Sequence, residues 1–281
     1  MPFGLTYRRR LLGLMLAGIA AFPAQASMTP AERKMVATVD AESERSIGLL
    51  EKLVNINSGT MNPAGVERVY EAVKPELEQL GFTVNWAPMK EVNRAGHLVA
   101  EHKGKVGTKR LLLIGHLDTV FEPSSPFQTF SRKGDTAEGP GVGDCKGGDV
   151  VIIAALRAMK AAGTLDKANI IVVMTGDEER LAAPVSVSRK ALLDAADRSD
   201  VALDFEGLVR INGKDMGSTS RRSSVSWQLT TTGKAAHSSA IFNDGIGYGA
   251  IYEMARILDG FQAGCIAKRF RAVMADPEAE L

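Results

Sequence analysis

The stretch Leu111-Leu-Leu-Ile-Gly-His-Leu-Asp118 decides the fold that the sequence predicts. Its apolar run, Leu111 to Ile114, shows no alternation, and such a run is typical of a central parallel strand covered on both faces. Gly115 lets the backbone turn behind that strand. His116 and Asp118 are two residues apart, so in an extended chain their side chains point to the same side. The stretch therefore predicts a buried strand that delivers an imidazole and a carboxylate to one site.

Composition limits the class of protein. The chain of 281 residues is 45% hydrophobic and 24% charged, which is ordinary for a globular protein of one or two domains. Its 34 Lys+Arg and 33 Asp+Glu give a net charge of +1, so no overall field favours nucleic acid or a membrane surface as a partner. Two cysteines, Cys145 and Cys265, are too few for a disulfide scaffold, so the hydrophobic core must stabilise the fold.

The first residues are typical of an export signal. Arg8-Arg-Arg10 precede an apolar stretch from Leu11 to Phe22, and Ala24-Gln-Ala26 has the small-x-small pattern that signal peptidase cuts. The apolar stretch is shorter than the ~20 residues that a membrane-spanning helix needs. We therefore expect residues 1–26 to be a signal peptide and the mature protein to be periplasmic or secreted, through either the Sec or the twin-arginine route.

Three more segments of the chain carry acidic residues that could belong to the same site. The glycine-dense loop Glu138–Gly148 lacks the dinucleotide fingerprint and the Gly-Lys-Ser/Thr of a P-loop, so we interpret its glycines as room for Asp144 to enter a crowded site. Ile170–Met174 is a second continuous apolar strand, and it ends in Thr175-Gly-Asp-Glu-Glu179. Asp200-Val-Ala-Leu-Asp-Phe-Glu-Gly207 is a further strand end. Because open α/β sheets keep their sites at the C-terminal ends of parallel strands, these segments are expected to meet.

The adjacent carboxylates of Glu178 and Glu179 suggest a cation. Taken alone this pair would be a solvated acidic turn, but the other strand ends favour a metal site. Like charges so close repel each other, so we expect one glutamate to bind metal and the other to keep a raised pKa for proton transfer. Asp204 and Glu206 lie on one side of an extended chain, and one of them is expected to be a further ligand.

Helical segments alternate with the strands, which predicts an α/β fold. Residues 27–217 are expected to form one domain with a largely parallel central sheet and helices on both faces, and residues 218–281 to begin a smaller α+β domain. His97 and His102 are interpreted as surface or strand histidines, because no carboxylate or cysteine cluster accompanies them. The expected helices are 29 to about 55, 66–80, 149–162, 187–196 and 245–260, and further strands are expected at 82–86, 97–101 and 224–232.

In combination these motifs resemble the zinc aminoacylase and carboxypeptidase superfamily, which includes glutamate carboxypeptidase, acetylornithine deacetylase and succinyl-diaminopimelate desuccinylase. The resemblance covers most of the chain after the signal peptide and is greatest to the glutamate carboxypeptidase branch. It implies a phosphorylase/hydrolase-like catalytic domain with two zinc ions, for which Co²⁺ or Mn²⁺ can substitute, followed by a lid that also forms a homodimer. The motifs that carry it are Gly-His-Leu-Asp-Thr-Val, Gly-Val-Gly-Asp-Cys-Lys-Gly-Gly, Thr-Gly-Asp-Glu-Glu, Asp-Phe-Glu-Gly and Gly-Lys-Ala-Ala-His-Ser.

The resemblance also implies a role for each site residue. His116 binds one zinc, and Asp118 fixes the tautomer of its ring. Asp144 bridges both ions, Glu179 binds the other zinc, and Glu178 is the general base that takes a proton from water.

Four further expectations rest on the same resemblance. Glu206 is the ligand paired with His116, with Asp204 as the alternative. His237 reaches the partner's active site in the dimer and stabilises the oxyanion. The peptide bond between Asp144 and Cys145 is cis, and Cys145 is a packed thiol rather than a ligand.

Two functions remain open at this stage. The first is an exported dizinc metallopeptidase or amidohydrolase that cleaves a C-terminal amino acid of the glutamate type or an N-acyl amino acid. The second is an inactive remnant of that fold that binds metal or a partner. In the family the lid continues beyond the length seen here and a later segment supplies a zinc-binding histidine, so we expect a C-terminal truncation and little hydrolysis by residues 27–281 alone.

Overall fold

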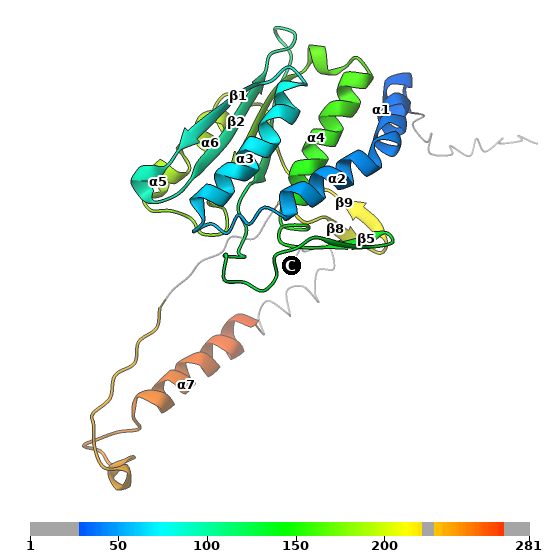
Figure 1. Ribbon diagram of the computed structural model, residues 1–281. Helices are drawn as coiled ribbons and strands as arrows, with labels where there is room; N and C mark the ends of the chain where they lie inside the picture. Colours follow the sequence, from blue (N-terminus) through cyan, green and yellow to red (C-terminus); the bar gives the residue numbers. More distant parts are fainter. Residues whose placement is uncertain (1–27, 221–227, 267–281) are drawn as a thin grey trace, which may run out of the picture. The chain divides into compact units, whose positions relative to one another are not determined.

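The computed structural model describes residues 28–220 and 228–266 (Figure 1). The chain forms two compact units, the first ending at Gly217 and the second beginning at Ser218. The expected signal peptide lies outside the described residues, as does part of the expected strand at 224–232. Each unit is described below by itself.

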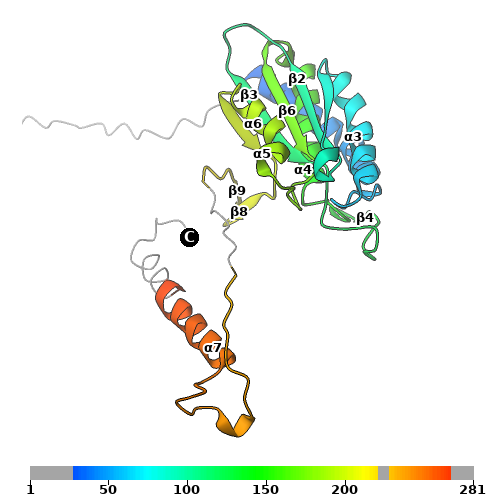
Figure 2. The same cartoon turned by 90° about the vertical axis from the view of Figure 1, so that its left-hand side faces the viewer.

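A five-stranded sheet in the order β1-β2-β6-β3-β7 forms the centre of the first unit (Figures 1 and 2). β3 pairs in parallel with both β6 and β7, whereas β2 is antiparallel to β1 and β6, so β2 alone is reversed. The predicted strands at 111–114 and 170–174 are therefore parallel neighbours in a mostly parallel sheet, which confirms that prediction. The strands span Thr83–Pro88 (β1), Gly96–His102 (β2), Arg110–His116 (β3), Asn169–Thr175 (β6) and Val201–Asp204 (β7).

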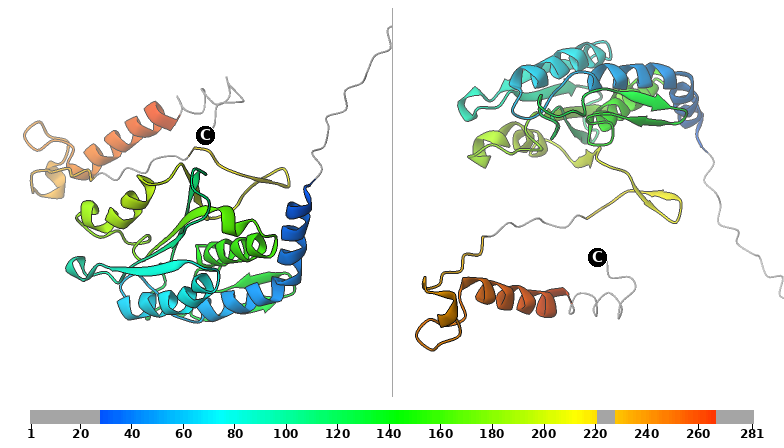
Figure 3. Two further views of the ribbon diagram at one scale, coloured as in Figure 1. Left: turned by 90° about the horizontal axis from the view of Figure 1, so that it is seen from above. Right: turned by 60° about the horizontal axis from the view of Figure 1, so that its bottom comes forward.

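Helices cover both faces of this sheet (Figure 3). The main core lies on the face covered by α2, α3 and α4, where Leu113 and Val172 are buried. A smaller core lies under α6 on the opposite face, where Leu112 and Ile171 are buried. Neighbouring residues of one apolar run thus enter different cores, which explains why the central strands show no alternation. The helices span Pro30–Ala41 (α1), Ser43–Val54 (α2), Pro63–Glu78 (α3), Lys146–Ala161 (α4), Val185–Ser188 (α5) and Lys190–Ala196 (α6).

Two of the expected helices are interrupted. The segment expected to be helical from 29 to about 55 divides at Glu42, the residue between α1 and α2. α1 buries no residue, whereas α2 buries four, so the chain can turn there without uncovering the core. The segment expected at 187–196 divides at Arg189, whose side chain leaves the helix to bind Asp177.

The remaining elements of the first unit are short. Two small hairpins lie outside the central sheet. One turn of 3-10 helix precedes β2, and another follows α4. Among the residues that the structure describes, no helix is both long enough and apolar enough to cross a membrane. These short elements are Ser131–Lys133 (β4), Thr136–Glu138 (β5), Val209–Ile211 (β8), Lys214–Met216 (β9), Lys90–Val92 (η1) and Leu165–Lys167 (η2).

The regular secondary structure in the described part of the second unit is helical. It contains η3 at Ser238–Ala240, α7 at Ala250–Phe261 and a π-helical turn, η4, at Gln262–Ile266. The helix expected from 245 begins later because Gly249 precedes it with a φ of 81°, which is not helical. Residues 228–232 form no strand, since the described residues of this unit offer no second strand with which they could pair.

Candidate metal centre

Three parallel strands, β3, β6 and β7, end at the edge of the sheet where the candidate residues lie. His116 is the last residue of β3 and is paired with Thr175, the last residue of β6. β7 ends at Asp204, two residues before Glu206. Asp144 directly precedes Cys145, the residue that caps the N-terminus of α4. The parallel topology therefore brings together side chains that are far apart in the sequence.

The buried imidazole of His116 has a defined orientation. Its Nδ1 lies 3.0 Å from the carbonyl oxygen of Asp118 and 3.4 Å from that residue's Oδ1. Both of these atoms only accept hydrogen bonds, so Nδ1 carries the proton. Nε2 lies 2.9 Å from Asp144 Oδ1 and 3.4 Å from Glu206 Oε1. Burial opposes protonation of the ring, but hydrogen bonds with Asp118 and Glu206 outweigh it and raise the pKa of His116 above its usual range. A metal ion would displace the proton on Nε2, and the neutral ring would then offer the Nε2 lone pair that a ligand requires.

Asp118 connects the imidazole to the segment that carries the two glutamates. Its fully buried carboxylate accepts hydrogen bonds from the backbone N–H of Glu178 at 3.1 Å and from that of Glu179 at 3.2 Å. The hydroxyl of Thr60 donates a third, at 2.7 Å. Burial opposes ionisation, but the hydrogen bonds from His116 and Thr60 outweigh it and hold the pKa of Asp118 below its usual range. Asp118 thus stays a carboxylate that orients its neighbours.

The glutamates have the opposite shift. Burial, followed by the charge of Asp144, raises the pKa of Glu179 to about 7. Burial also raises the pKa of Glu178, to which the charge of Glu206 adds. Negative charge is therefore crowded at this edge, and ionisation of the last carboxyl groups is unfavourable unless a cation offsets it.

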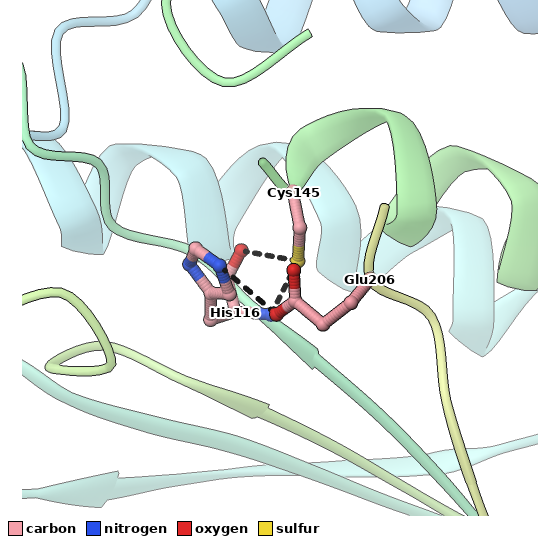
Figure 4. A group of neighbouring side chains, drawn as sticks. All are labelled: His116, Cys145 and Glu206. Atoms are coloured by element: carbon pink, nitrogen blue, oxygen red, sulfur yellow. Dashed lines mark hydrogen bonds and ion pairs between the residues drawn. The ribbon is translucent and has the colours of Figure 1, made fainter. Parts of the chain in front are cut away.

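Glu206 reaches His116 because the chain after β7 approaches α4 closely. A Cβ atom on Gly148 would lie 1.9 Å from the carbonyl oxygen of Phe205, so only glycine allows this approach. The side chain of Glu206 is 22% exposed and directed at the imidazole (Figure 4). Of the two carboxylates considered for this position, Glu206 is the one beside Nε2; Asp204 pairs with Ile114 in the sheet.

Three further buried groups, those of Cys145, Lys146 and Asp149, lie next to the cluster. The thiol of Cys145 accepts the backbone N–H of His116 at 3.2 Å, and burial raises its pKa to about 12. Burial also raises the pKa of Asp149 well above its usual range. Lys146 is fully buried and donates to the carbonyl oxygens of Leu53 and Ile56 at 3.0 and 2.9 Å, which joins the start of α4 to the end of α2. The peptide bond between Asp144 and Cys145 is cis, as expected from the sequence.

The donor set fits zinc. One donor atom each from His116, Asp144 and Glu179 lie within 4.8 Å of one another, and His116, Cys145 and Glu206 form a second such group. Two donors on one tetrahedral zinc, each about 2.0 to 2.1 Å from the ion, are about 3.3 Å apart. The separations of 2.9 and 3.4 Å from Nε2 to Asp144 and Glu206 are close to this value. Imidazole and carboxylate ligands suit Zn²⁺, and Co²⁺ or Mn²⁺ can take the same positions.

The structure brings together six of the seven residues selected from the sequence. His237, the seventh, belongs to the second unit, where it precedes η3 and lies 2.9 Å from Ser239 Oγ through Nδ1. Thr60, whose hydroxyl binds Asp118, was not selected from the sequence. No local signal links it to Asp118, since the two are 58 residues apart. The six are His116, Asp118, Asp144, Glu178, Glu179 and Glu206.

Fold and cluster together define an α/β domain with a candidate metal site at the C-terminal edge of a mostly parallel sheet. Comparison with protein families agrees. Residues 112–245 match the model of peptidase family M20/M25/M40, and residues 219–272 match the peptidase dimerisation domain. Over these residues the chain thus resembles the M20/M25/M40 peptidases, a family of metal-dependent hydrolases whose metal is typically zinc.

Individual relatives support this assignment. Carboxypeptidase G2 from Pseudomonas sp. (strain RS-16) is 36% identical over 203 residues, which cover 71% of this chain and 47% of that protein. Succinyl-diaminopimelate desuccinylase from Leptothrix cholodnii is 27% identical over 201 residues, 68% of this chain and 51% of the relative. The chain thus spans about half the length of the curated relatives that it matches.

Solved structures support the fold. Human carnosine dipeptidase 1 matches with a TM-score of 0.54 and 20% identity, over 63% of this chain and 41% of that one. The dipeptidase Dug1p from Saccharomyces cerevisiae matches with a TM-score of 0.52 and 16% identity, over 61% and 40% of the two chains.

Proposed function

We propose that the protein is an exported dizinc hydrolase that cleaves an amide bond next to a carboxylate-bearing amino acid. The substrate is a peptide with a C-terminal amino acid of the glutamate type or an N-acyl amino acid. Similarity to carboxypeptidase G2 and to a succinyl-diaminopimelate desuccinylase supports this class, since both names denote cleavage of such a bond.

The convergence of Asp144, Glu179 and Glu206 near Nε2 of His116 carries the proposal. His116 and Glu206 would hold one ion, Glu179 would hold the other, and Asp144 would bridge the two. When bound, zinc supplies a Lewis acid for the scissile carbonyl and lowers the pKa of the attacking water. Positive charge at this position also offsets the crowding that raises the pKa of Glu179.

Glu178 is the general base in this proposal. Its carboxyl is not among the clustered ligand atoms, while its backbone N–H is held by Asp118. A raised pKa brings this carboxyl closer to neutral pH, where a base can take a proton from water and return it to the leaving nitrogen. Its ionised form is the active one, so the rate rises with pH as Glu178 loses its proton.

Export, dimerisation and the role of His237 complete the proposal. The basic and apolar residues at positions 8–22, with Ala24-Gln-Ala26, support export to the periplasm or beyond. The match of residues 219–272 to a dimerisation domain supports a homodimer, in which His237 stabilises the oxyanion in the partner's site.

Metal content and turnover, measured on one sample, test this function. The metal-free protein is titrated with zinc, and hydrolysis of N-acyl glutamates and of peptides ending in glutamate is followed by release of the free amino acid. For a protein in which both zinc sites have all their ligands, we expect two zinc ions per chain and turnover that depends on them. Zinc binding without hydrolysis of any such substrate would contradict the enzyme and favour a metal-binding protein of the same fold. Absence of zinc binding would contradict both.

A further inference from the structure

The segment from Gly176 to Arg189 carries both glutamates of the site, and it leaves β6 without regular structure until α5 begins at Val185. Asp118 holds only the backbone N–H groups of Glu178 and Glu179. Their side chains repel each other and the other carboxylates of the cluster. Other contacts must therefore keep the segment 176–189 in place despite this repulsion.

Asp177 supplies those contacts from within the segment. Its side chain is fully buried, and its hydrogen-bond partners lie later in the segment rather than in the metal cluster. Oδ2 accepts the backbone N–H of Ala182 at 3.0 Å and the hydroxyl of Ser188 at 2.7 Å. Oδ1 accepts Nη1 of Arg189 at 2.5 Å, and Nη2 of the same guanidinium donates to the carbonyl oxygen of Asp177 at 3.4 Å. One carboxylate thus joins the beginning, middle and end of the segment.

His97 closes the same arrangement from β2. Its Nε2 lies 2.7 Å from the carbonyl oxygen of Ser188, so Nε2 carries the proton, and Nδ1 accepts the backbone N–H of Gly176 at 3.1 Å. A Cβ atom on Gly176 would lie 2.2 Å from the carbonyl oxygen of Gly96, so the approach of the segment to β2 depends on glycine. The ring is buried and both of its nitrogens are engaged, which leaves none for a metal.

A third side chain holds the middle of the segment. Arg94 donates from Nε and Nη2 to the carbonyl oxygen of Arg180, at 3.0 and 2.9 Å. This carbonyl belongs to the residue directly after Glu179. The two glutamates are therefore held on one side by Asp118 and on the other by contacts that involve no residue of the metal cluster.

We propose that Asp177, Ser188, Arg189 and His97 form a clamp that positions Glu178 and Glu179 for metal binding and proton transfer. These four are positioning residues, because none touches the expected ions or substrate. The proposal rests on the proposed function for its catalytic meaning, but the mechanical claim concerns the metal-free protein as well. Partners of this kind typically change metal affinity about 10- to 100-fold when removed.

Arg189→Met is the main test, because Arg189 is ten positions from Glu179 and is not one of the expected metal ligands. Hydrogen exchange of the metal-free full chain is measured by mass spectrometry, and zinc affinity by competition with a chelator. We expect exchange across residues 176–182 to rise at least about 10-fold, with little change in β3, and zinc affinity to fall about 10-fold or more. Arg198→Met is the matched control: Arg198 binds Glu101 at 2.6 Å on an exposed surface and should change neither quantity.

The double variant Asp177→Asn/Arg189→Met separates positioning from general destabilisation. Arg189→Met alone leaves a buried unpaired carboxylate, so it lowers the melting temperature. Removing the charge as well should restore much of the melting temperature, while exchange at 176–182 stays fast and zinc affinity stays low. If exchange in this segment is unchanged in both variants, the clamp is wrong. If exchange rises as expected but the unaltered protein binds no zinc, the clamp stands and the proposed function is wrong.

Discussion

Replacing Asp118 with Asn is the perturbation whose effect the structure defines best. The carboxylate accepts three hydrogen bonds, from Thr60 and from the backbones of Glu178 and Glu179, and it faces the Nδ1–H of His116. An amide of the same shape has one oxygen and an NH₂ group, which would be directed at N–H or O–H donors. Whichever way the amide turns, at least one buried donor loses its acceptor.

The magnitude follows from the kind of contact that is lost. A hydrogen bond to a charged group contributes about 1.5–3 kcal/mol, and an unsatisfied buried donor adds to the loss. We therefore expect the free energy of unfolding of the metal-free protein to fall by about 3 kcal/mol, which for a unit of this size lowers the melting temperature by roughly 6–12 °C. Zinc affinity should fall about 10- to 100-fold, since the imidazole and the glutamate segment lose their common support.

Urea unfolding and chelator competition measure the two effects. Asp200→Asn is the control, because Asp200 accepts the backbone N–H of Arg110 at 2.7 Å and an amide oxygen can do the same. That variant should differ little from the unaltered protein. If Asp118→Asn loses no more stability than the control and binds zinc equally well, Asp118 does not organise the site as described.

Three further predictions concern the same edge of the sheet. Glu178→Gln should leave zinc affinity nearly unchanged in a chelator titration but lower turnover by about 10²- to 10⁴-fold, because the amide cannot accept a proton, whereas Asp144→Ala should abolish zinc binding. The pKa of Glu179 is raised from 4.5 to about 7, so its stabilising contribution is complete below about pH 4.5 and is lost as the pH rises through 7. Glu179→Gln should therefore make the metal-free protein more stable at pH 8 by about 1 kcal/mol after allowance for solvent screening, and weaken zinc binding; equal unfolding curves at pH 8 would contradict the shift. Burial lowers the pKa of Lys146 to about 8 from 10.5, so the contribution of neutral Lys146 to stability is complete above pH 10.5 and is lost as the pH falls through 8. Between pH 7.5 and 10.5, the free energy of unfolding measured in urea should therefore rise by about 2 kcal/mol more in the unaltered protein than in Lys146→Met.

The sheet was predictable because the sequences of two of its central strands, β3 and β6, are unbroken apolar runs. Leu112 and Ile171 enter one core while Leu113 and Val172 enter the other, so the requirement for burial on both faces appears directly as an unbroken apolar run. The division of the helix at Arg189 has no local signal in the sequence, and the side chain of Arg189 contacts Asp177, twelve residues earlier.

The ligand cluster was predictable to the extent that strand ends and motifs locate it. His116, Glu179 and Glu206 each follow or end a parallel strand, so topology alone brings them to one edge. The supporting contacts have no such signal. Thr60 looks like a turn residue, and Lys146 belongs to a type that is almost always exposed, although it is fully buried and bonded to two carbonyl oxygens.

Anomalous diffraction at the zinc absorption edge, from crystals of the zinc-loaded protein, tests the central claim most directly. The account predicts two ions at the C-terminal edge of the sheet, both in contact with Asp144, one of them also bound by His116 Nε2 and the other by Glu179. An anomalous map with no ion at this edge, or with zinc bound only by residues outside this cluster, would contradict it.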